Sequence, residues 1–266
     1  MSEGLLFAIG LTVLGLLVGS FLNVVIARVP AKQSIATPAS SCPKCGQLLR
    51  WRDNIPLLSW CLLRGRCRQC AEPISVRYPL IEAANALLWL GLAWWAMGIS
   101  TRISLLPLLL ALASAGLALA AIDLQHHRLP DAIVLPLYPL TVLGLALSQL
   151  ITSQGYWIQA LIGALIWGVT IGGLWLVTAG GGMGLGDAKL APVLGAVTAW
   201  LGIAESIIGL FAAFLIGAIV GVVLIVSGRS QRRARLAFGP FLLGGAMCAV
   251  FFGTPLWELY AGAMGL

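Results

Sequence analysis

Two aspartates in this 266-residue chain stand where carboxyl groups could do acid–base chemistry. Asp123 closes an apolar stretch in Ala-Ile-Asp-Leu-Gln-His-His-Arg, and Asp187 ends a glycine-rich run in Gly-Met-Gly-Leu-Gly-Asp. Two carboxyl groups brought close together cannot both ionise at low cost, so one keeps a proton while the other is charged. Such a pair titrates as a unit and can activate water for peptide hydrolysis. The glycines before Asp187 would let a substrate backbone come close.

Each aspartate near these motifs also has a purely structural interpretation. Asp131 follows Pro130 and precedes an apolar run, which is typical of the N-cap of a helix. Asp187 could cap the helix that follows it in the same way. Asp123 alone could be a boundary residue whose side chain reaches water. Composition and spacing leave these alternatives open.

Four other features of the sequence are less informative. Glu82 lies a few residues inside an apolar stretch, and solvation at a membrane boundary would explain it. Lys189 could extend its amine to the boundary, or it could act electrostatically on Asp187. His126 and His127 are too few to predict a metal site. The glycine run 180–186 lacks the Gly-Lys-Ser/Thr ending of a phosphate loop.

Four cysteines have the spacing of a metal site. They form two CxxC pairs separated by 21 residues: Cys42, Cys45, Cys67 and Cys70. Two such pairs can supply four thiolates to one tetrahedral zinc ion, and a small basic segment without a core needs such a link. Unmetallated thiols or a redox pair are the alternatives. Cys61 and Cys248 have no partner at motif spacing and are interpreted as apolar residues.

The composition places these motifs in a membrane protein. Hydrophobic residues make up 60% of the chain and charged residues only 9%, and the mean hydropathy is +0.99. A soluble domain carries about 25% charged residues. The chain therefore has too little polar surface for a soluble globule, and a disordered or collagenous chain is excluded as well.

Apolar stretches predict the number of membrane spans. Runs without charged residues cover 4–27, 83–101, 103–122, 132–186, 190–204, 206–228 and 236–257. A span needs about 20 apolar residues, so 132–186 should hold two helices, divided near 152–155. We predict an all-α integral membrane bundle of about eight transmembrane helices, in which 190–204 is the shortest. The alternation of a membrane β-barrel is absent from these runs.

The basic residues indicate the orientation. The net charge of +7 and the pI of about 9.4 would suggest nucleic acid binding in a soluble protein. Here the residues follow the membrane: nine of the 16 Lys and Arg lie in 28–77, and four more lie in 229–235. Short basic loops stay cytoplasmic, so eight spans place the N-terminus outside and leave only Arg102 on that side. We expect no nucleic acid partner.

The chain should have three parts. Residues 1–28 form a retained first helix rather than a cleaved signal peptide, because no basic segment precedes a run this long. Residues 29–77, called the insert below, form a cytoplasmic zinc-binding segment. Residues 78–266 form the multi-span core, in which abundant glycine allows close helix packing.

The order of these motifs resembles that of the bacterial type IV prepilin peptidases, membrane aspartic proteases with a GxGD signature. The similar blocks are Gly19–Val25, Arg28–Pro30, the two CxxC pairs, Asn54–Leu57, Arg77–Glu82, Ile122–Asp131, Gly182–Leu190 and Phe238–Phe241. The resemblance covers nearly the whole chain.

The resemblance implies a function. Such enzymes cut the short basic leader of type IV prepilins and pseudopilins, for pili or type II secretion, on the cytoplasmic side of the inner membrane. The cut follows a glycine, and many members then methylate the new N-terminal residue with S-adenosylmethionine. The catalytic pair falls on Asp123 and Asp187 and the zinc ligands on the four cysteines. Asn23, Arg77 and Glu82 are the candidates for the methyl-donor site.

Three other functions are compatible with parts of the sequence. A GxGD protease with other substrates would use the same aspartates. A proton-coupled transporter would use paired carboxyl groups as a relay, but it needs a polar path through the spans, whose outer halves are almost entirely apolar. A non-enzymatic zinc-ribbon membrane scaffold would need neither aspartate.

Overall fold

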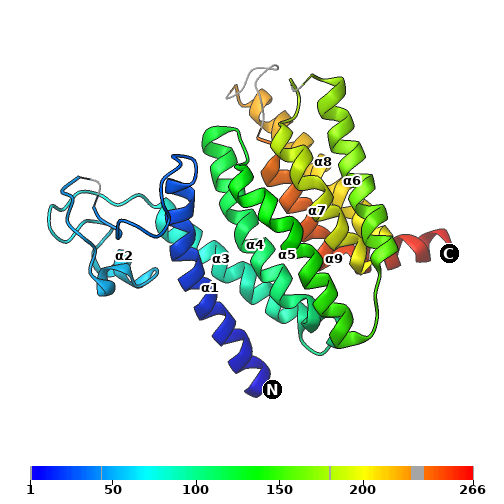
Figure 1. The fold of residues 1–266 in the computed structure, drawn as a ribbon, viewed down its shortest axis with the longest axis horizontal. Coiled ribbons are helices and arrows are strands. Elements are labelled where there is room, and N and C mark those ends of the chain that lie inside the picture. The colour runs from blue at the N-terminus through cyan, green and yellow to red at the C-terminus, as the bar shows by residue number, and fades with distance from the viewer. Residues whose placement is uncertain (1, 43, 180, 229–236, 266) are drawn as a thin grey trace. The chain divides into compact units, whose positions relative to one another are not determined.

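The computed structural model describes residues 2–42, 44–179, 181–228 and 237–265. Within these ranges the protein is helical and forms no β-strand (Figure 1). Two isolated bridges, Ser41–Leu48 and Arg66–Pro73, are the β-type pairings in this part of the chain. The prediction of an all-α protein is confirmed.

Eight long helices correspond to the eight predicted spans. They are α1 (Ser2–Arg28), α3 (Arg77–Ala96), α4 (Ser100–His126), α5 (Asp131–Thr152), α6 (Trp157–Val177), α7 (Leu185–Leu201), α8 (Ile203–Val226) and α9 (Gly239–Met264). Six of these, all except α3 and α7, are long and apolar enough to cross a membrane. At 17 residues, α7 is the shortest, as its sequence indicated.

The insert contains two short helical segments that the sequence did not predict. A 3-10 turn, η1 (Trp51–Asn54), is followed by the single-turn helix α2 (Leu58–Leu62). The predicted division near 152–155 is confirmed, because α5 ends at Thr152 and α6 begins at Trp157. Further along, Gly202 separates α7 from α8.

The interpretation of Asp131 as an N-cap is wrong by one position. Pro130 occupies the N-cap of α5 in extended conformation, and Asp131 is the first residue of the helix. The φ angle of −66° at Pro130 is the one that its ring imposes, so the proline can end the preceding loop without strain. Asp131 therefore stands in the first helical turn, where its side chain is free to bind elsewhere.

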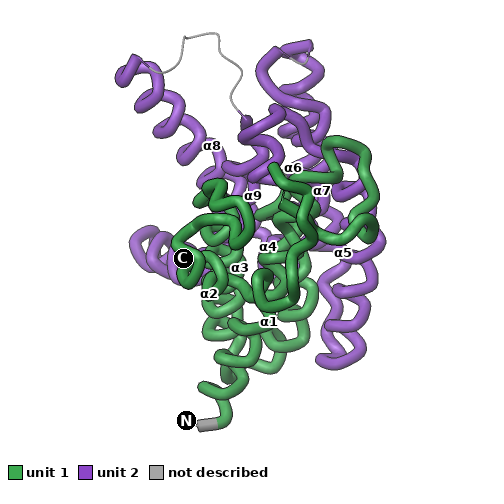
Figure 2. The backbone as a smooth tube through the Cα atoms, turned by 90° about the vertical axis from the view of Figure 1, so that its left-hand side faces the viewer, with its two compact units in different colours: residues 1–118 green, residues 119–266 purple. Residues whose placement is uncertain are grey.

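The chain forms two compact units, unit 1 (residues 1–118) and unit 2 (residues 119–266), coloured separately in Figure 2. Unit 1 contains α1, the insert, α3 and the first part of α4. Unit 2 contains the last two turns of α4 and helices α5 to α9. The expected division into parts at residues 28 and 77 stays a prediction.

Glycines bring the helices of unit 2 into close contact. A Cβ atom on Gly195 of α7 would overlap the backbone carbonyl of Gly163 on α6, and one on Gly245 of α9 would overlap that of Gly209 on α8. Membrane helices lack a hydrophobic force between them, so close van der Waals contact at small residues drives their packing. These two contacts show the close helix packing that the abundance of glycine in the sequence predicted.

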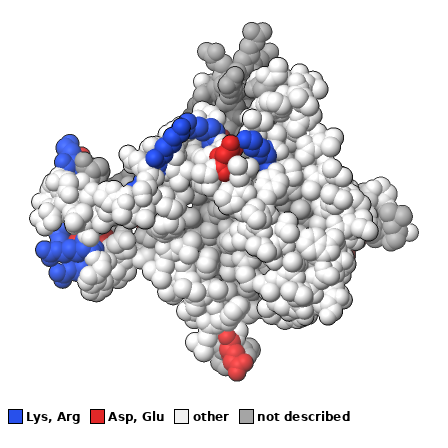
Figure 3. Space-filling model, in the orientation of Figure 1, with Lys and Arg blue, Asp and Glu red and all other residues white. Residues whose placement is uncertain are grey.

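The surface agrees with a membrane protein. Uncharged residues make up most of the face in Figure 3, and many large apolar side chains are exposed, such as Leu143 and Val169 at 68% and 70%. An apolar surface of this extent needs lipid around it. The arginines 229, 232, 233 and 235, which contributed to the predicted orientation, lie outside the described residues.

Candidate active site and metal centre

The two aspartates named by the sequence, called the dyad below, lie in unit 2 at the ends of two helices. Asp123 is in the last turn of α4, and Asp187 is in the first turn of α7. Both side chains are buried, with exposed fractions of 4% and 5%. They are near enough for the charge of Asp123 to act on Asp187. The structure therefore brings together two residues that are 64 positions apart.

Each carboxyl group is held by the backbone of a glycine. Oδ2 of Asp123 accepts a hydrogen bond of 3.0 Å from the N–H of Gly239, the first residue of α9. Oδ2 of Asp187 accepts one of 3.0 Å from the N–H of Gly184, the N-cap of α7. Asp187 is therefore not the N-cap that the sequence left open, because Gly184 has that position; as the third residue of α7, Asp187 binds back to the N-cap N–H. Helix N-termini carry a partial positive charge and favour carboxylates.

One leucine packs against both glycines that lie next to the dyad, Gly186 and Gly239. Leu129 lies 2.7 Å from the position that a Cβ on Gly186, next to Asp187, would take. The same side chain lies 3.2 Å from a Cβ position on Gly239, and Oδ2 of Asp123 lies only 2.9 Å from it. A larger residue at either glycine would therefore displace Leu129 or the carboxyl group of Asp123. Both glycines are needed for close approach rather than for a positive φ angle.

The second oxygen of Asp187 is left without a hydrogen-bond partner in the described part of the chain. Oδ1 of Asp187 is buried and has no hydrogen-bond partner among the described residues. A buried acceptor without a partner costs free energy, and such atoms gather at sites that bind a proton, a water molecule or a substrate. With Oδ2 held by a backbone N–H, Oδ1 is the atom of this carboxyl group that can do chemistry.

Asp131 and Lys189 form an ion pair beside the dyad. The Nζ atom of Lys189 lies 2.8 and 2.9 Å from the two carboxylate oxygens of Asp131, and the Tyr138 hydroxyl donates to the backbone oxygen of Lys189 at 2.7 Å. The pair joins the starts of α5 and α7. The carboxylate that Lys189 binds is thus that of Asp131 and not that of Asp187. His126 and His127 are exposed.

The four predicted metal ligands come together in unit 1. The sulfur atoms of Cys42, Cys45, Cys67 and Cys70 all lie within 4.8 Å of one another, and those of Cys42 and Cys70 are 3.8 Å apart. Four sulfurs around zinc in a tetrahedron, with Zn–S bonds of about 2.3 Å, are about 3.8 Å apart. Cys61 is exposed and Cys248 lies in unit 2, and neither belongs to this cluster.

Two similar turns present the cysteines. In the first, the N–H of Cys42 binds the carbonyl of Gln47, and the N–H of Gly46 binds that of Cys42, both at 2.9 Å. In the second turn, the N–H of Cys67 binds the carbonyl of Glu72 at 2.8 Å, and the N–H of Ala71 binds the carbonyl of Cys67 at 2.9 Å. Positive φ angles at Gly46 and Ala71 close the two turns. Glycine suits this conformation, whereas alanine in the second turn is under strain.

Backbone N–H groups also prepare the first cysteine for a metal. Hydrogen bonds from Cys45 and then Lys44 lower the pKa of the Cys42 thiol to about 6. The thiolate is the form that binds zinc, so the first turn favours the ligand form of Cys42. The donor set, its spacing and its backbone geometry all fit a tetrahedral zinc ion.

The three candidates for a methyl-donor site lie where α1 meets α3. Asn23 and Glu82 are buried, with exposed fractions of 3% and 8%. Asn23 donates to the backbone oxygen of Tyr78 at 3.2 Å, and Glu82 accepts a hydrogen bond of 2.8 Å from the N–H of Leu57. Arg77 begins α3, with its guanidinium 5.5 Å from the ring centre of Tyr78.

Sequence reasoning did not identify the residues that hold the dyad in place. The roles of Gly184 and Gly239 as hydrogen-bond donors, the contact of Leu129 and the Asp131–Lys189 pair appear only in the structure. One signal was available, because the Gly-Pro step at 239–240 is typical of a helix start whose free N–H groups can bind a carboxylate.

Two families match the chain over successive segments. Residues 13–96 match the bacterial peptidase A24 N-terminal domain, and residues 109–222 match the type IV leader peptidase family. The first match covers the insert and its flanking helices, and the second covers both aspartates of the dyad. No solved structure matches the chain.

Three relatives that match most of this chain carry the same name. A prepilin leader peptidase/N-methyltransferase of Pseudomonas putida is 37% identical and covers 96% of this chain and 93% of the relative. A protein of the same name from Myxococcus xanthus is 42% identical over 86% of this chain and 67% of its own length. A third, from Pseudomonas aeruginosa, is 34% identical over 97% of this chain and 95% of its own length.

Proposed function

The chain belongs to the type IV leader peptidase family, and from this membership we propose that it cleaves the leader peptide of type IV prepilins and pseudopilins after a glycine. The observation that carries the proposal is the dyad: two buried carboxyl groups held by glycine N–H groups, with Oδ1 of Asp187 left without a hydrogen-bond partner among the described residues. A pair of this kind is suited to peptide hydrolysis by an activated water molecule.

In the proposed mechanism, Asp123 and Asp187 share one proton across a water molecule. The ionised carboxylate takes a proton from the water molecule while the water oxygen bonds to the carbonyl carbon of the leader glycine. The protonated carboxyl group gives its proton to the carbonyl oxygen, which forms a tetrahedral intermediate. The carbon–nitrogen bond then breaks, and the leaving amine takes a proton from the dyad. Water and one peptide yield an acid and an amine.

We place the dyad at the cytoplasmic side of the inner membrane, with the N-terminus outside. In the described part of unit 2, the basic residues are Arg128, which follows α4, and Lys189, which pairs with Asp131. Both stand at the helix ends that carry the dyad. Short basic segments are retained in the cytoplasm, and the basic insert supports the same orientation.

We further propose that the insert binds one structural zinc ion through Cys42, Cys45, Cys67 and Cys70. A bound zinc ion would supply a link between the two turns and no catalysis, because four thiolates leave no open position. The second activity in the relatives' name, N-methylation, is proposed for this chain too. S-adenosylmethionine would supply a methyl group to the new N-terminal amine. The nitrogen lone pair would form the new carbon–nitrogen bond, and the electrons of the broken sulfur–methyl bond would stay on sulfur.

An in vitro cleavage assay tests the peptidase. Purified protein in detergent is incubated with a model prepilin, and Asp123→Ala and Asp187→Ala are compared with the wild type. Removal of acid–base catalysis should lower the rate about 100-fold or more in each variant. Asp53→Ala, which alters an aspartate of the insert, is the matched control. Near-normal cleavage by Asp187→Ala would overturn the dyad, and no cleavage of several prepilins by folded wild type would favour a scaffold or transporter.

A further inference from the structure

The insert contains a run of ten residues without a charge. Nine Lys and Arg lie in 28–77, yet residues 54–63, called the uncharged run below, contain no Lys, Arg, Asp or Glu. The single-turn helix α2 is part of this run. Two of its leucines, Leu58 and Leu62, are 52% and 73% exposed. Segments surrounded by water rarely expose contiguous apolar surface of this kind, so the surroundings of the run need an explanation.

The two exposed leucines share one face of α2. They are four residues apart, and residues at this spacing are neighbours on a helix surface. The other side of α2 is bound to the insert. There the Ser59 hydroxyl donates to the backbone oxygen of Arg52 at 3.0 Å, and Nε1 of Trp60 donates to that of Ile74 at 3.2 Å. The leucines therefore point away from the rest of the insert.

A buried carboxyl group fixes the level of the uncharged run along the helices of unit 1. Oε2 of Glu82, on α3, accepts a hydrogen bond of 2.8 Å from the N–H of Leu57. A Cβ atom on Gly19 of α1 would lie 2.8 Å from the Cα atom of Glu82, so the two helices are in backbone contact there. Gly19 precedes Arg28, the last residue of α1, by nine residues, which is about 13 Å along a helix. The run thus lies beside the apolar part of α1, and Figure 1 shows α2 beside this helix.

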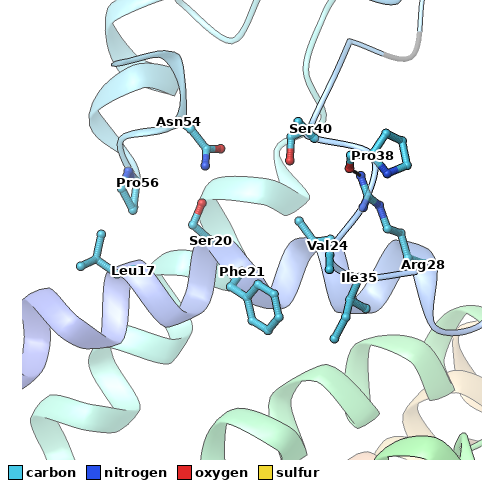
Figure 4. A pocket seen from close by; sticks show the side chains of 12 residues that line it. Leu17, Ser20, Phe21, Val24, Arg28, Ile35, Pro38, Ser40, Asn54 and Pro56 are labelled. Atoms are coloured by element: carbon cyan, nitrogen blue, oxygen red, sulfur yellow. Dashed lines mark hydrogen bonds between the residues drawn. The ribbon is translucent and has the colours of Figure 1, made fainter. Parts of the chain in front are cut away.

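A cavity of about 270 Å³ between the insert and α1 places the start of the run at the same level (Figure 4). Asn54 and Pro56 line it together with Leu17 and Ser20 of α1. In Figure 4 Asn54 faces Ser20, and Pro56 lies nearest to Leu17. Leu17 and Phe21 are 54% and 48% exposed, on a helix that is long and apolar enough to cross a membrane. The exposed face of the run therefore continues an apolar surface that needs lipid around it.

The backbone of the run is arranged for surroundings with little water. Leu57 has φ 57° and ψ −50°, and the N–H of Leu58 binds the carbonyl of Pro56 at 2.6 Å, which is a γ-turn of the strained kind. The carboxyl group of Glu82 binds the N–H at the centre of this turn and holds it. Irregular backbone at membrane depth occurs where protein groups satisfy it. A buried carboxyl group at this position has that effect.

Aromatic and basic residues come just before the run. Trp51 is 82% exposed and stands between Arg50 and Arg52, which are exposed as well. Tryptophan is enriched at the interface between lipid and water, and basic residues near that surface are attracted to anionic headgroups. A basic and aromatic stretch followed by an uncharged one is typical of a segment that lies in the plane of the interface.

From these observations we propose that the uncharged run lies in the lipid of the membrane interface, with Leu58 and Leu62 against acyl chains and Trp51 among the headgroups. The insert is thus anchored on the bilayer by its own side chains, in addition to its covalent links to α1 and α3. The contact uses neither aspartate of the dyad. Asp187→Ala should therefore keep it, and a failure of the proposed peptidase activity would leave it unaffected.

Photo-crosslinking of the full chain in phospholipid nanodiscs tests the contact. Benzoylphenylalanine in place of Leu62 should form covalent adducts with phospholipid, which mass spectrometry detects on the peptide that carries the probe. The same probe in place of Gln69, an exposed polar residue of the second cysteine turn, is the matched control and should form no lipid adduct. Val169, which is 70% exposed on α6, is the positive control. Elution volume reports whether each variant is folded.

Three outcomes would overturn the proposal. The first is a probe at Leu62 that forms no lipid adduct in nanodiscs in which the probe at Val169 does. The second is an equal yield of lipid adduct at Leu62 and Gln69, because the contact would then not belong to the uncharged run. The third is an adduct of the Leu62 probe with another protein in native membranes in place of lipid, which would assign the run to a protein partner.

The double variant Leu58→Asp/Leu62→Asp tests whether lipid holds the run in place. Both side chains point away from the insert, so the change acts mainly on what lies outside the chain. Because a charged group is costly in lipid, hydrogen exchange of the peptide that covers 54–63 should become about tenfold faster in nanodiscs. Leu48→Asp, at a position that is 57% exposed outside the run, should leave this exchange unchanged. Exchange at the wild-type rate in the double variant would contradict a lipid contact.

Discussion

In unit 2 each aspartate of the dyad accepts a hydrogen bond from a glycine N–H at the start of a helix, whereas in unit 1 the four cysteines stand on turns outside any long helix. The helices around the dyad are fixed by close contacts such as Gly163 with Gly195. Within 29–76, the buried described residues are Cys42, Ser59 and Gly65. The insert therefore has no core of its own.

The difference teaches where each unit obtains its order. Unit 2 positions its chemistry by helix packing, which is available because lipid excludes water from the backbone. The insert lies outside the apolar helices and buries too little surface to offset its conformational entropy. It needs a link that does not depend on a core, and a metal ion supplies one. Four predictions follow from this comparison, ordered from the change that should cost the most free energy to the one that should cost the least.

Metal removal should have the largest effect and should be confined to the insert. Structural zinc contributes about 10–16 kcal/mol in small zinc-binding peptides, so the double variant Cys42→Ser/Cys67→Ser should lose zinc and the order of residues 29–77. Limited proteolysis with mass spectrometry would locate new cuts in the insert, and metal analysis would count the zinc. Cys61→Ser is the control and should keep one zinc per chain. A protease-resistant insert without zinc would contradict the comparison.

Gly195→Leu should destabilise unit 2 by about 3 kcal/mol, since its side chain would overlap the backbone of Gly163 on α6. Thermal unfolding in detergent measures the loss. Gly172→Leu on the same α6 helix is the control, because a Cβ atom there has no neighbour within 4 Å. If both variants unfold at the same temperature, close helix contact is not what orders unit 2.

Gly239→Ala should lower the rate of prepilin cleavage about 10- to 100-fold, which corresponds to about 1.4–2.8 kcal/mol. The added Cβ would lie 2.9 Å from Oδ2 of Asp123 and 3.2 Å from Leu129, so the carboxyl group must move. The cleavage assay measures kcat and KM separately. Gly244→Ala on the same helix makes an ordinary contact of 3.8 Å and serves as control. Unchanged kcat in Gly239→Ala would show that the held position of Asp123 is unimportant.

The Asp131–Lys189 pair should have the smallest effect. Both side chains are partly exposed, at 54% and 34%, and exposed ion pairs contribute about 0–1 kcal/mol. Lys189→Ala should therefore change the cleavage rate less than about fivefold. The charge-swapped double variant Asp131→Lys/Lys189→Asp should recover part of that change. A loss of 100-fold in Lys189→Ala would instead assign Lys189 an electrostatic role at the dyad.

Much of the architecture follows from local sequence. Apolar runs set the eight long helices, because a helix in lipid must satisfy every backbone group internally. The division between α5 and α6 was visible as a polar interruption at 152–155, and Gly202 separates α7 from α8 three residues before the predicted break at Glu205. The γ-turn at Leu57 was not visible, because nothing in Asn-Ile-Pro-Leu requires a positive φ at leucine.

The sequence by itself determined the residue types that can do chemistry: carboxyl groups at the ends of apolar runs and cysteines at metal spacing. Those signals are local, since they depend on hydropathy and on short intervals along the chain. Only the tertiary structure decided that Asp123 is held by Gly239, 116 residues away, and that Glu82 holds the turn at Leu57. Backbone N–H groups look the same in every residue, so only the packing of helices selects which of them meets a given carboxyl group.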